Sequence, residues 1–469
     1  MTFFASLALV FVLVVRPQEI WTWMEALHLL DVLTALVVLG LGAEIALKKQ
    51  KDLFTPQIPF LFGFLGACYL ITAISIGVAP AMDLAMRNGL FPVIFAAAII
   101  YGVKNLSQLK TMIWLLVGLG LFMAAVAIHQ GRVPPVCIAK ERAEDGEMTV
   151  NPELADGRDC GLTSDCRTED TGFDDWACEH IGMFGTFSVG RRVRWRGQLA
   201  DPNELSVYLG GIISFLIAML FPVSGPSAAP PLSSRKGRLV VALGLLGIVL
   251  YAIILTQSRG GQLVVAAVFM AYFVSRVGWK GIFVAALFAL PVIALGGRDD
   301  PEADESSAER FELLYDGISL FITHPIRGVG VHQFSDQIGA TLTAHKSYLL
   351  AVTELGLPGF YVWLGLLWTS LKIPLNAMKR DTLSPAIRSI AMATVVSFCG
   401  IAVGIFFLSF TYKQLLFVWF GLSGALYRIA RQEDPTLTIK MGWKDYVGIA
   451  GANVGIVTAL YLYTRLKGH

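Results

Sequence analysis

The ionisable side chains best placed to do chemistry in this sequence stand at the head of an apolar segment, AHKSYLLAVTELGLPG, residues 344–359. His345 can take a proton from a hydroxyl at neutral pH, because the ordinary pKa of an imidazole is about 6.5. Ser347 and Glu354 are seven residues apart and share a helix face, whereas His345 and Glu354 are nine apart and point roughly opposite ways. We therefore interpret His345 as a candidate base and Glu354 as a residue that locks or orients helices. An ordinary histidine at a helix start would show the same local pattern.

Further histidines and arginines precede this head. His324, His332 and His345 fall within 22 residues, beside Arg310 and Arg327. Imidazoles are common metal ligands, but the spacing lacks a close His-x-x-x-His pair and the carboxylates are not interleaved with the histidines. We predict an anion-binding and proton-transfer cluster with no metal and no cofactor.

Arg259 is a third candidate, in the stretch TQSRGGQL, residues 256–263. It stands between two apolar segments, with only a two-glycine hinge after it. A charge held that close to hydrocarbon is costly and is a functional candidate by default. The alternative is an arginine whose head group reaches out to water or lipid headgroups.

Four arginines surround one tryptophan in RRVRWRGQLADPNE, residues 191–204, and Arg196 is the last of the four. Such a cluster either contacts lipid headgroups at a helix entry or binds an anionic ligand through its guanidinium forks. The DPNE sequence that follows is typical of a capped helix start, with Asp201 as the cap, Pro202 in the first turn and Asn203 beside them.

The elements that must position these side chains are membrane helices. Of 469 residues, 55% are hydrophobic and only 15% charged, a composition that excludes an ordinary soluble domain. Apolar runs long enough to cross a membrane recur along the chain, and backbone groups in lipid must be satisfied internally, so the runs are helices. The predicted spans are 2–15, 28–47, 57–77, 87–103, 108–128, 204–222, 239–257, 260–277, 280–296, 346–371, 388–410, 413–430 and 446–464.

Basic side chains gather in alternate short loops between these spans, which places the amino terminus and those loops in the cytoplasm. The short loops on the opposite side contain four exceptions: Arg16, Arg87, Arg259 and Lys413. We expect an all-α polytopic integral membrane protein of about 12–13 transmembrane helices with two long external, periplasmic loops. The expected units are the helices of 1–128, a loop at 129–203, the helices of 204–296, a catalytic loop with an amphipathic helix at 297–345, and the helices of 346–469.

The first external loop contains four of the six cysteines: Cys137, Cys160, Cys166 and Cys178. An even number in one external loop favours two disulfides in an oxidising compartment. A metal site is the alternative, since Cys160 and Cys166 lie near His180, although the spacing matches no common zinc pattern. The sequence does not decide how the four would pair.

Taken together, these motifs resemble the signature of the O-antigen ligase and Wzy polymerase superfamily. The run from His345 through Ser347 to Glu354, Gly356 and Gly359 is similar to that family's periplasmic histidine followed by Glu-x-Gly-x-x-Gly. Other matching pieces occur in order over about 190–430: Asp201 to Glu204, Ser258-Arg259-Gly260, and Pro325 with Gly328-Val-Gly330. The sequence departs from the family in Lys346, where asparagine is frequent, and in its four-cysteine insertion.

The resemblance implies a metal-independent glycosyltransferase of the bacterial inner membrane with its active site facing the periplasm. The implied donor is a glycan on polyprenyl (undecaprenyl) diphosphate, and the acceptor is a hydroxyl on a glycan or lipid-linked molecule. Arg259 and Arg310 resemble the family's diphosphate-binding arginines, with Arg327 and Arg196 as further candidates, and His345 resembles its base. Ser347, Glu354, Asn203 and His332 are expected to support or orient them.

Alternatives remain for the reaction. Within the superfamily the acceptor is a lipid A-core sugar, a growing polysaccharide, or a protein Ser or Thr. Outside it, a transporter or flippase for the same lipid would also carry arginines, but transporters usually place charges at the midplane and show inverted repeats. The expected partners are the lipid-linked donor, the acceptor and membrane lipids, and nucleic acid is not among them.

Overall fold

The protein is a multi-pass helical membrane protein. The computed structural model describes residues 2–50, 53–142, 148–166, 175–221, 232–295, 301–339 and 344–467. Among them are 11 helices long and apolar enough to cross a membrane. One of these 11, Arg259–Leu295, contains two predicted spans joined by a short turn, and the predicted span 413–430 is a helix that is not among the 11. Every predicted span coincides with a helix, so the all-α membrane class is confirmed.

The helices follow the predicted spans closely, with some longer ends and extra pieces. They are α1 Thr2–Val15, α2 Leu29–Ala46, α3 Ile58–Ile76, α4 Val78–Ala85, α5 Phe91–Gly102, α6 Leu106–Gln130, α7 Pro202–Leu220, α8 Leu232–Leu255, α9 Arg259–Val277, α10 Gly281–Leu295, α11 Pro301–Thr323, α12 Gln333–Ile338, α13 Ser347–Ala377, α14 Pro385–Gly404, α15 Gln414–Glu433 and α16 Trp443–Lys467. A π-helical turn, Met86–Leu90, joins α4 to α5.

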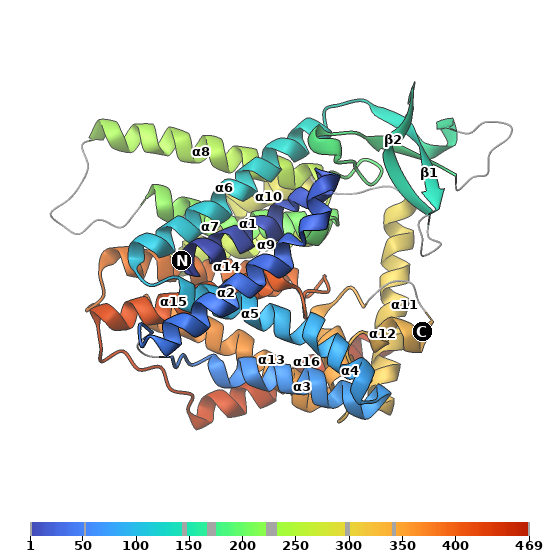
Figure 1. Ribbon diagram of the computed structural model, residues 1–469. Coiled ribbons are helices and arrows are strands. Elements are labelled where there is room, and N and C mark those ends of the chain that lie inside the picture. The colour runs from blue at the N-terminus through green and yellow to red at the C-terminus, as the bar shows by residue number, and fades with distance from the viewer. Residues whose placement is uncertain are drawn as a thin grey trace.

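The helices form a bundle, and a small sheet and one crossing helix lie at one end of it (Figure 1). The long helices lie side by side, and α11 stands across one end of them. Strands β1 Pro135–Arg142 and β2 Met148–Asp159 lie at the same end, which we call the sheet end. The amphipathic helix predicted in the second long loop is thus α11.

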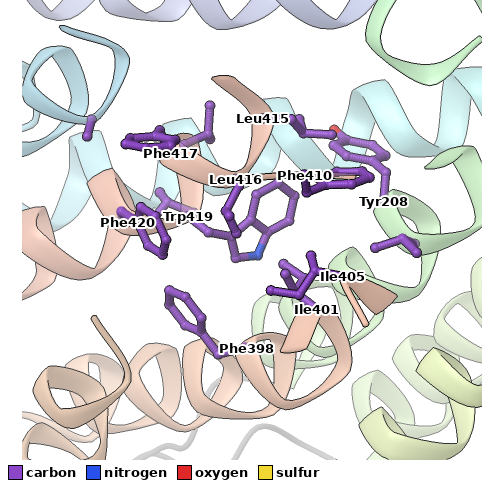
Figure 2. Close-up of a cluster of buried hydrophobic side chains, with 14 of the residues drawn as sticks. Tyr208, Phe398, Ile401, Ile405, Phe410, Leu415, Leu416, Phe417, Trp419 and Phe420 are labelled. Carbon is purple, nitrogen blue, oxygen red and sulfur yellow. The ribbon is translucent and has the colours of Figure 1, made fainter. Parts of the chain in front are cut away.

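The core forms where α7, α14 and α15 cross (Figure 2). Tyr208 and Trp419 meet edge to face, with ring centroids 5.8 Å apart, and both are almost fully buried. Trp419 Nε1 donates to Ser397 Oγ at 2.7 Å, and Ser397 Oγ donates to the Gly211 carbonyl at 2.7 Å. A buried indole N–H must find an acceptor, so these bonds fix the register of the three helices.

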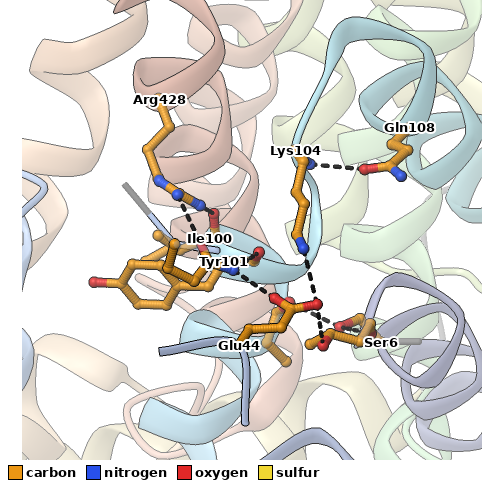
Figure 3. A network of polar contacts seen from close by, with 10 residues as sticks. Ser6, Glu44, Ile100, Tyr101, Lys104, Gln108 and Arg428 are labelled. Carbon is orange, nitrogen blue, oxygen red and sulfur yellow. Dashed lines mark hydrogen bonds and ion pairs between the residues drawn. The ribbon is translucent and has the colours of Figure 1, made fainter. Parts of the chain in front are cut away.

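A polar network ties helix ends together at the end of the bundle away from the sheet (Figure 3). Lys104 Nζ pairs with Glu44 Oε1 at 2.8 Å, joining the chain between α5 and α6 to α2. Arg428 of α15 donates to the Ile100 carbonyl at 2.8 Å and to Gln50 Oε1 at 2.7 Å. These contacts satisfy charges at the membrane boundary and hold α2, α5 and α15 in one register.

A small antiparallel sheet, which the sequence analysis did not predict, occupies the first long loop. β3 Trp176–His180 pairs with β1, giving the order β2-β1-β3. The four cysteines form two disulfides, Cys137–Cys166 and Cys160–Cys178. Their sulfurs are therefore bonded to each other, and His180 Nδ1 lies 2.5 Å from the Val133 carbonyl. The disulfides hold a sheet too small to be stable through its own apolar core.

We expect the double variant Cys137→Ser, Cys166→Ser to loosen the sheet and leave the helices in place. The bridged residues are 29 apart, and losing such a cross-link costs about 2–4 kcal/mol. Limited proteolysis in detergent should show faster cleavage within 135–180. Cys399→Ser, which removes a free thiol in α14, is the control. Equal protease resistance in the double variant would contradict a stabilising role for the bridge.

Candidate active site

His345 lies at the sheet end where three elements meet. It precedes Lys346, the N-cap of α13, and its backbone is left-handed with φ 46°. Its imidazole is half-buried and within electrostatic range of Arg310 on α11, Asp201 at the start of α7, and Lys413 just before α15. The structure therefore brings together an imidazole, a carboxylate and several cations from segments far apart in the sequence.

This setting lowers the pKa of His345 below its usual 6.5. Burial is the largest cause, and the charges of Arg310, Lys413 and Lys346 act in the same direction, while Asp201 opposes them. Burial and the three cations disfavour the charged imidazolium, and the carboxylate of Asp201 favours it. Because the pKa is lowered, His345 is neutral at pH 7 and can accept a proton there.

Lys346 is perturbed by the same surroundings. Burial, then Arg310 and Lys467, lower the pKa of its ammonium from 10.5 to about 8. Three basic groups from α11, α16 and the head of α13 therefore act on one another at the sheet end. A cluster of cations that lowers the pKa values of its own members favours a bound anion.

Ser347 fastens the head of α13 to the segment 405–413. Its N–H donates to the Ile405 carbonyl at 3.0 Å, and its carbonyl accepts from Thr411 Oγ1 at 3.0 Å. Its hydroxyl accepts from the Phe410 N–H at 2.7 Å and donates to the Leu408 carbonyl. The side chain is fully buried. Ser347 thus holds the backbone that carries His345.

The start of α7 also lies near His345. Asp201 caps the helix, accepting from the Asn203 N–H at 2.7 Å. Asn203 Oδ1 accepts from Arg192 Nη2 at 2.9 Å, and Arg192 Nε donates to the Thr256 carbonyl at 3.1 Å. Asn203 therefore acts through Arg192, which ties α7 to the turn before α9. One residue further into α7, Glu204 forms an ion pair with Lys413.

Arg259 is the first residue of α9 and is exposed. Ser258 caps that helix, its hydroxyl accepting from the Gly261 N–H at 3.0 Å. A methyl group placed on Gly260 would lie 3.6 Å from Phe407 Cβ, and one on Gly261 would lie 2.2 Å from Ser206 Oγ. The glycines therefore let α9 approach both α7 and the 405–413 segment. Arg259 and His345 both border that segment.

Arg196, a further candidate for binding the diphosphate, bonds to the backbone of two other segments. Its guanidinium donates to the carbonyls of Glu19 at 2.5 Å and Phe184 at 2.6 Å. Burial lowers its pKa, and the carboxylate of Glu19 opposes that effect. It fastens the amino-terminal turn Pro17–Glu19 to the chain that follows the sheet. Both acceptors are backbone carbonyls. Two residues further on, Gln198 contacts Gln414, the neighbour of Lys413.

Arg327 lies in a turn that packs against α13 well below His345. Val329 and Gly330 donate to the carbonyls of Thr353 at 3.1 Å and Glu354 at 3.0 Å, and Leu357 donates to the Pro325 carbonyl at 2.9 Å. Thr353 and Glu354 are six and seven residues after Ser347, the first residue of α13, which is about 9–11 Å along the helix at a rise of 1.5 Å per residue. Arg327 is exposed on that turn, at a different level of α13 from His345.

Glu354 and His332 belong to the same lower region. Glu354 is fully buried, and its Oε1 accepts from the Phe334 N–H at 3.2 Å. His332 Nε2 lies 2.9 Å from Asn88 Oδ1, and its ring stacks on Tyr412 with centroids 6.1 Å apart. Burial lowers the pKa of His332. The geometry joins Glu354 and His332 to the turn, and it also joins His332 to Tyr412 of the 405–413 segment.

Sequence reasoning passed over two members of the group around His345. Asp201 appeared only as a helix cap, and Lys413 only as an exception to the distribution of basic residues. That exception was the usable signal: of its four residues, Lys413 pairs with Glu204 at the start of α7, and Arg259 precedes Gly260, which packs close to Phe407 of the 405–413 segment. A lysine or arginine on a short external loop is therefore a candidate for binding an anionic ligand as well as for anchoring the loop to lipid headgroups.

Residues 243–364 match the family model described as O-Antigen ligase. This match, over about a quarter of the chain, supports the resemblance to the O-antigen ligase and Wzy polymerase superfamily. The matched region runs from within α8 into α13, so it includes Arg259, Arg310 and His345. The start of α7, Lys413 and α16 lie outside it. No curated protein matches the chain.

We predict that Gly356→Ala destabilises the protein. Gly356 interrupts α13 with φ 61° and ψ −178°, a conformation essentially restricted to glycine. A methyl group there would also lie 2.2 Å from the Ile326 carbonyl oxygen. The cost should be at least about 1–3 kcal/mol, seen as a lower unfolding temperature in detergent. Gly451→Ala in α16, where nothing lies within 4 Å, is the control. An unchanged unfolding temperature for Gly356→Ala would refute the strained contact.

Proposed function

We propose that the protein is a membrane glycosyltransferase that moves a glycan from a polyprenyl diphosphate, of which undecaprenyl is the usual form, to an acceptor hydroxyl. The reaction takes place at the sheet end, which faces the periplasm of a bacterial inner membrane, and it serves surface polysaccharide assembly. The observation that carries the proposal is an imidazole, His345, near Arg310, Lys413 and Asp201 at the end of a membrane bundle, in a chain whose residues 243–364 match the O-Antigen ligase family model.

The chemistry needs one base and a site for a leaving anion. The acceptor oxygen attacks the anomeric carbon, the bond from that carbon to the diphosphate oxygen breaks, and its electron pair leaves on the diphosphate. His345 Nδ1 or Nε2 takes the acceptor proton as the new bond forms. A single displacement inverts the anomeric centre. Because diphosphate is already a good leaving group, cationic side chains can stabilise its developing charge without a metal.

The arginines divide according to where the fold places them. Arg310 is within electrostatic range of His345, and Arg259 borders the same 405–413 segment. We assign the donor diphosphate to this pair, because guanidinium forks match phosphate oxygens. Arg196 and Arg327 were the other candidates; we place them second, because Arg196 donates to two backbone carbonyls and Arg327 lies on the turn that packs further along α13.

The first prediction concerns the base. His345→Ala should lose at least about 100-fold in transfer rate, the usual contribution of a general base, while binding of the lipid donor stays within a few-fold. Transfer would be measured with purified protein and a polyprenyl-diphosphate-linked repeat, and binding by equilibrium titration.

The matched control is His324→Ala, because His324 ends α11 and contacts the neighbouring Thr323. It should keep normal transfer. Full activity in His345→Ala would remove the catalytic assignment. A wild-type protein that only moves the lipid across the membrane would favour the transporter alternative. Ladder formation from the lipid-linked repeat alone would identify a polymerase, whereas dependence on an added core glycan would identify a ligase and dependence on an added protein an oligosaccharyltransferase.

The second prediction concerns pH. Lys346 lowers the pKa of His345, so Lys346→Gln should raise that pKa toward 6.5. The acidic limb of kcat/KM, where protonation of His345 stops the reaction, should then move to higher pH. Lys379→Gln, beyond the other end of α13, is the control and should leave the limb in place. A limb that stays fixed or moves to lower pH in Lys346→Gln would show that a different group governs it.

A further inference from the structure

An apolar groove follows the outer side of α13, between α14 and α16. Its larger part is a 550 Å³ hollow between Leu367 of α13, Phe398 of α14 and Ala452 of α16. A second hollow of 430 Å³ is lined by Leu263, Phe406 and Phe407, and the two parts share Tyr348, Ala402 and Ile456. The shared residues make them one groove with an almost wholly apolar lining.

One end of the groove opens at the candidate active site. Tyr348 is three residues after His345. Phe407 lies close to Gly260, the neighbour of Arg259: a methyl group on Gly260 would lie 3.6 Å from Phe407 Cβ. Tyr348 packs edge to face on Trp363 and contacts Phe406, with centroids 5.4 and 6.0 Å apart. Aromatic side chains therefore line the groove directly beneath the level of the cations.

The other end is closed by polar bonds. Asp445 accepts from Trp368 Nε1 at 2.9 Å and pairs with Lys372 Nζ at 2.5 Å. From Tyr348 to Leu371 the groove follows α13 for 23 residues, about 35 Å at 1.5 Å per residue. That length is comparable to the hydrocarbon thickness of a bilayer, roughly 30 Å.

The wall opposite α13 is α16, which lies outside the matched family region. Gly448, Ala452 and Ile456 recur every four residues and so form one face of that helix, with small side chains over its first half. At the sheet end, Tyr463 packs edge to face on Phe311 of α11 with centroids 6.1 Å apart, and Lys467 acts electrostatically on Lys346. The helix that walls the groove thus also reaches the cation cluster.

We propose that this groove holds the isoprenoid chain of the donor, with α16 as the wall that selects for chain length. The inference rests on the proposed function. It commits to an isoprenoid because a lipid diphosphate held at Arg259 and Arg310 must run its chain away from them at membrane depth. The groove begins beside those cations and continues through the apolar layer. Burying such a chain is favourable in proportion to the apolar area covered.

The test fills the groove and compares donors of different chain length. Ala452→Trp places an indole in the groove, and Ala450→Trp places one about 200° around the same helix, on an exposed position. KM and kcat would be measured for one glycan on undecaprenyl diphosphate and on neryl diphosphate. Ala452→Trp should raise KM for the long donor by about tenfold, equivalent to roughly 1.4 kcal/mol, and leave the short donor unchanged. Ala450→Trp should change neither.

A second readout does not depend on turnover. A diazirine-tagged polyprenyl phosphate without glycan should crosslink to α16 and α13 in the wild type and in Ala450→Trp, and lose that crosslink in Ala452→Trp. Gly448→Leu, at a position with nothing within 4 Å of an added Cβ, is the alternative filling variant if Ala452→Trp is not recovered as folded protein.

The outcomes separate the two proposals. Wild-type transfer together with equal kinetics for Ala452→Trp and Ala450→Trp, or crosslinks elsewhere, would overturn the groove alone. Crosslinking at α16 without transfer to any acceptor would overturn the proposed function and support the groove. A dimer that dissociates in Ala452→Trp with unchanged kinetics would assign the face to a second copy and overturn the isoprenoid.

Discussion

The bonds between Ser347 and the 405–411 segment are the interaction on which the candidate active site depends. A membrane helix ordinarily begins wherever the apolar stretch reaches the interface, with its first N–H groups turned to water. In α13 the first residue instead uses its N–H, carbonyl and hydroxyl to bond with four residues beyond α14. That contact fixes the height of His345 in the membrane and, through Lys413 and Glu204, its distance from α7.

The cations around His345 all lower the pKa of its imidazole. Arg310 arrives on a helix that crosses the bundle end, Lys346 precedes α13, and Lys413 leads into α15. Each of these cations favours the neutral form of the His345 imidazole, and a bound anion would reduce the repulsion among them. A bound diphosphate would therefore raise the basicity of His345 while it fills the site, so that donor binding and readiness of the base are coupled through the same cations.

Much of the fold, and part of the site, could be read from the sequence. The spans followed from runs of apolar residues, because lipid leaves a long apolar segment little choice other than a helix. Arg259 was singled out because charge at a membrane boundary is costly, and Arg310 and His345 because of the family resemblance; their roles stay predictions. The sheet of 135–180 was missed, since its strands are short and their pairing depends on bridges whose partners the spacing does not reveal. Arg196 and Arg327 were close in sequence to the right elements, but the carbonyls that hold Arg196, and the level at which the turn of Arg327 packs on α13, appear only in three dimensions.

The turn at 325–330 bears on how the protein is made. Its Val329 and Gly330 N–H groups are satisfied by the carbonyls of Thr353 and Glu354, in a helix synthesised after the turn. Until α13 enters the membrane, those donors have no helical partner and cannot be placed in lipid without a cost of several kcal/mol each. The turn must therefore wait in an aqueous or interfacial position and dock once α13 is inserted. Insertion of α13 and docking of the turn are then separate steps in the biogenesis of the chain, and the turn docks at the break at Gly356.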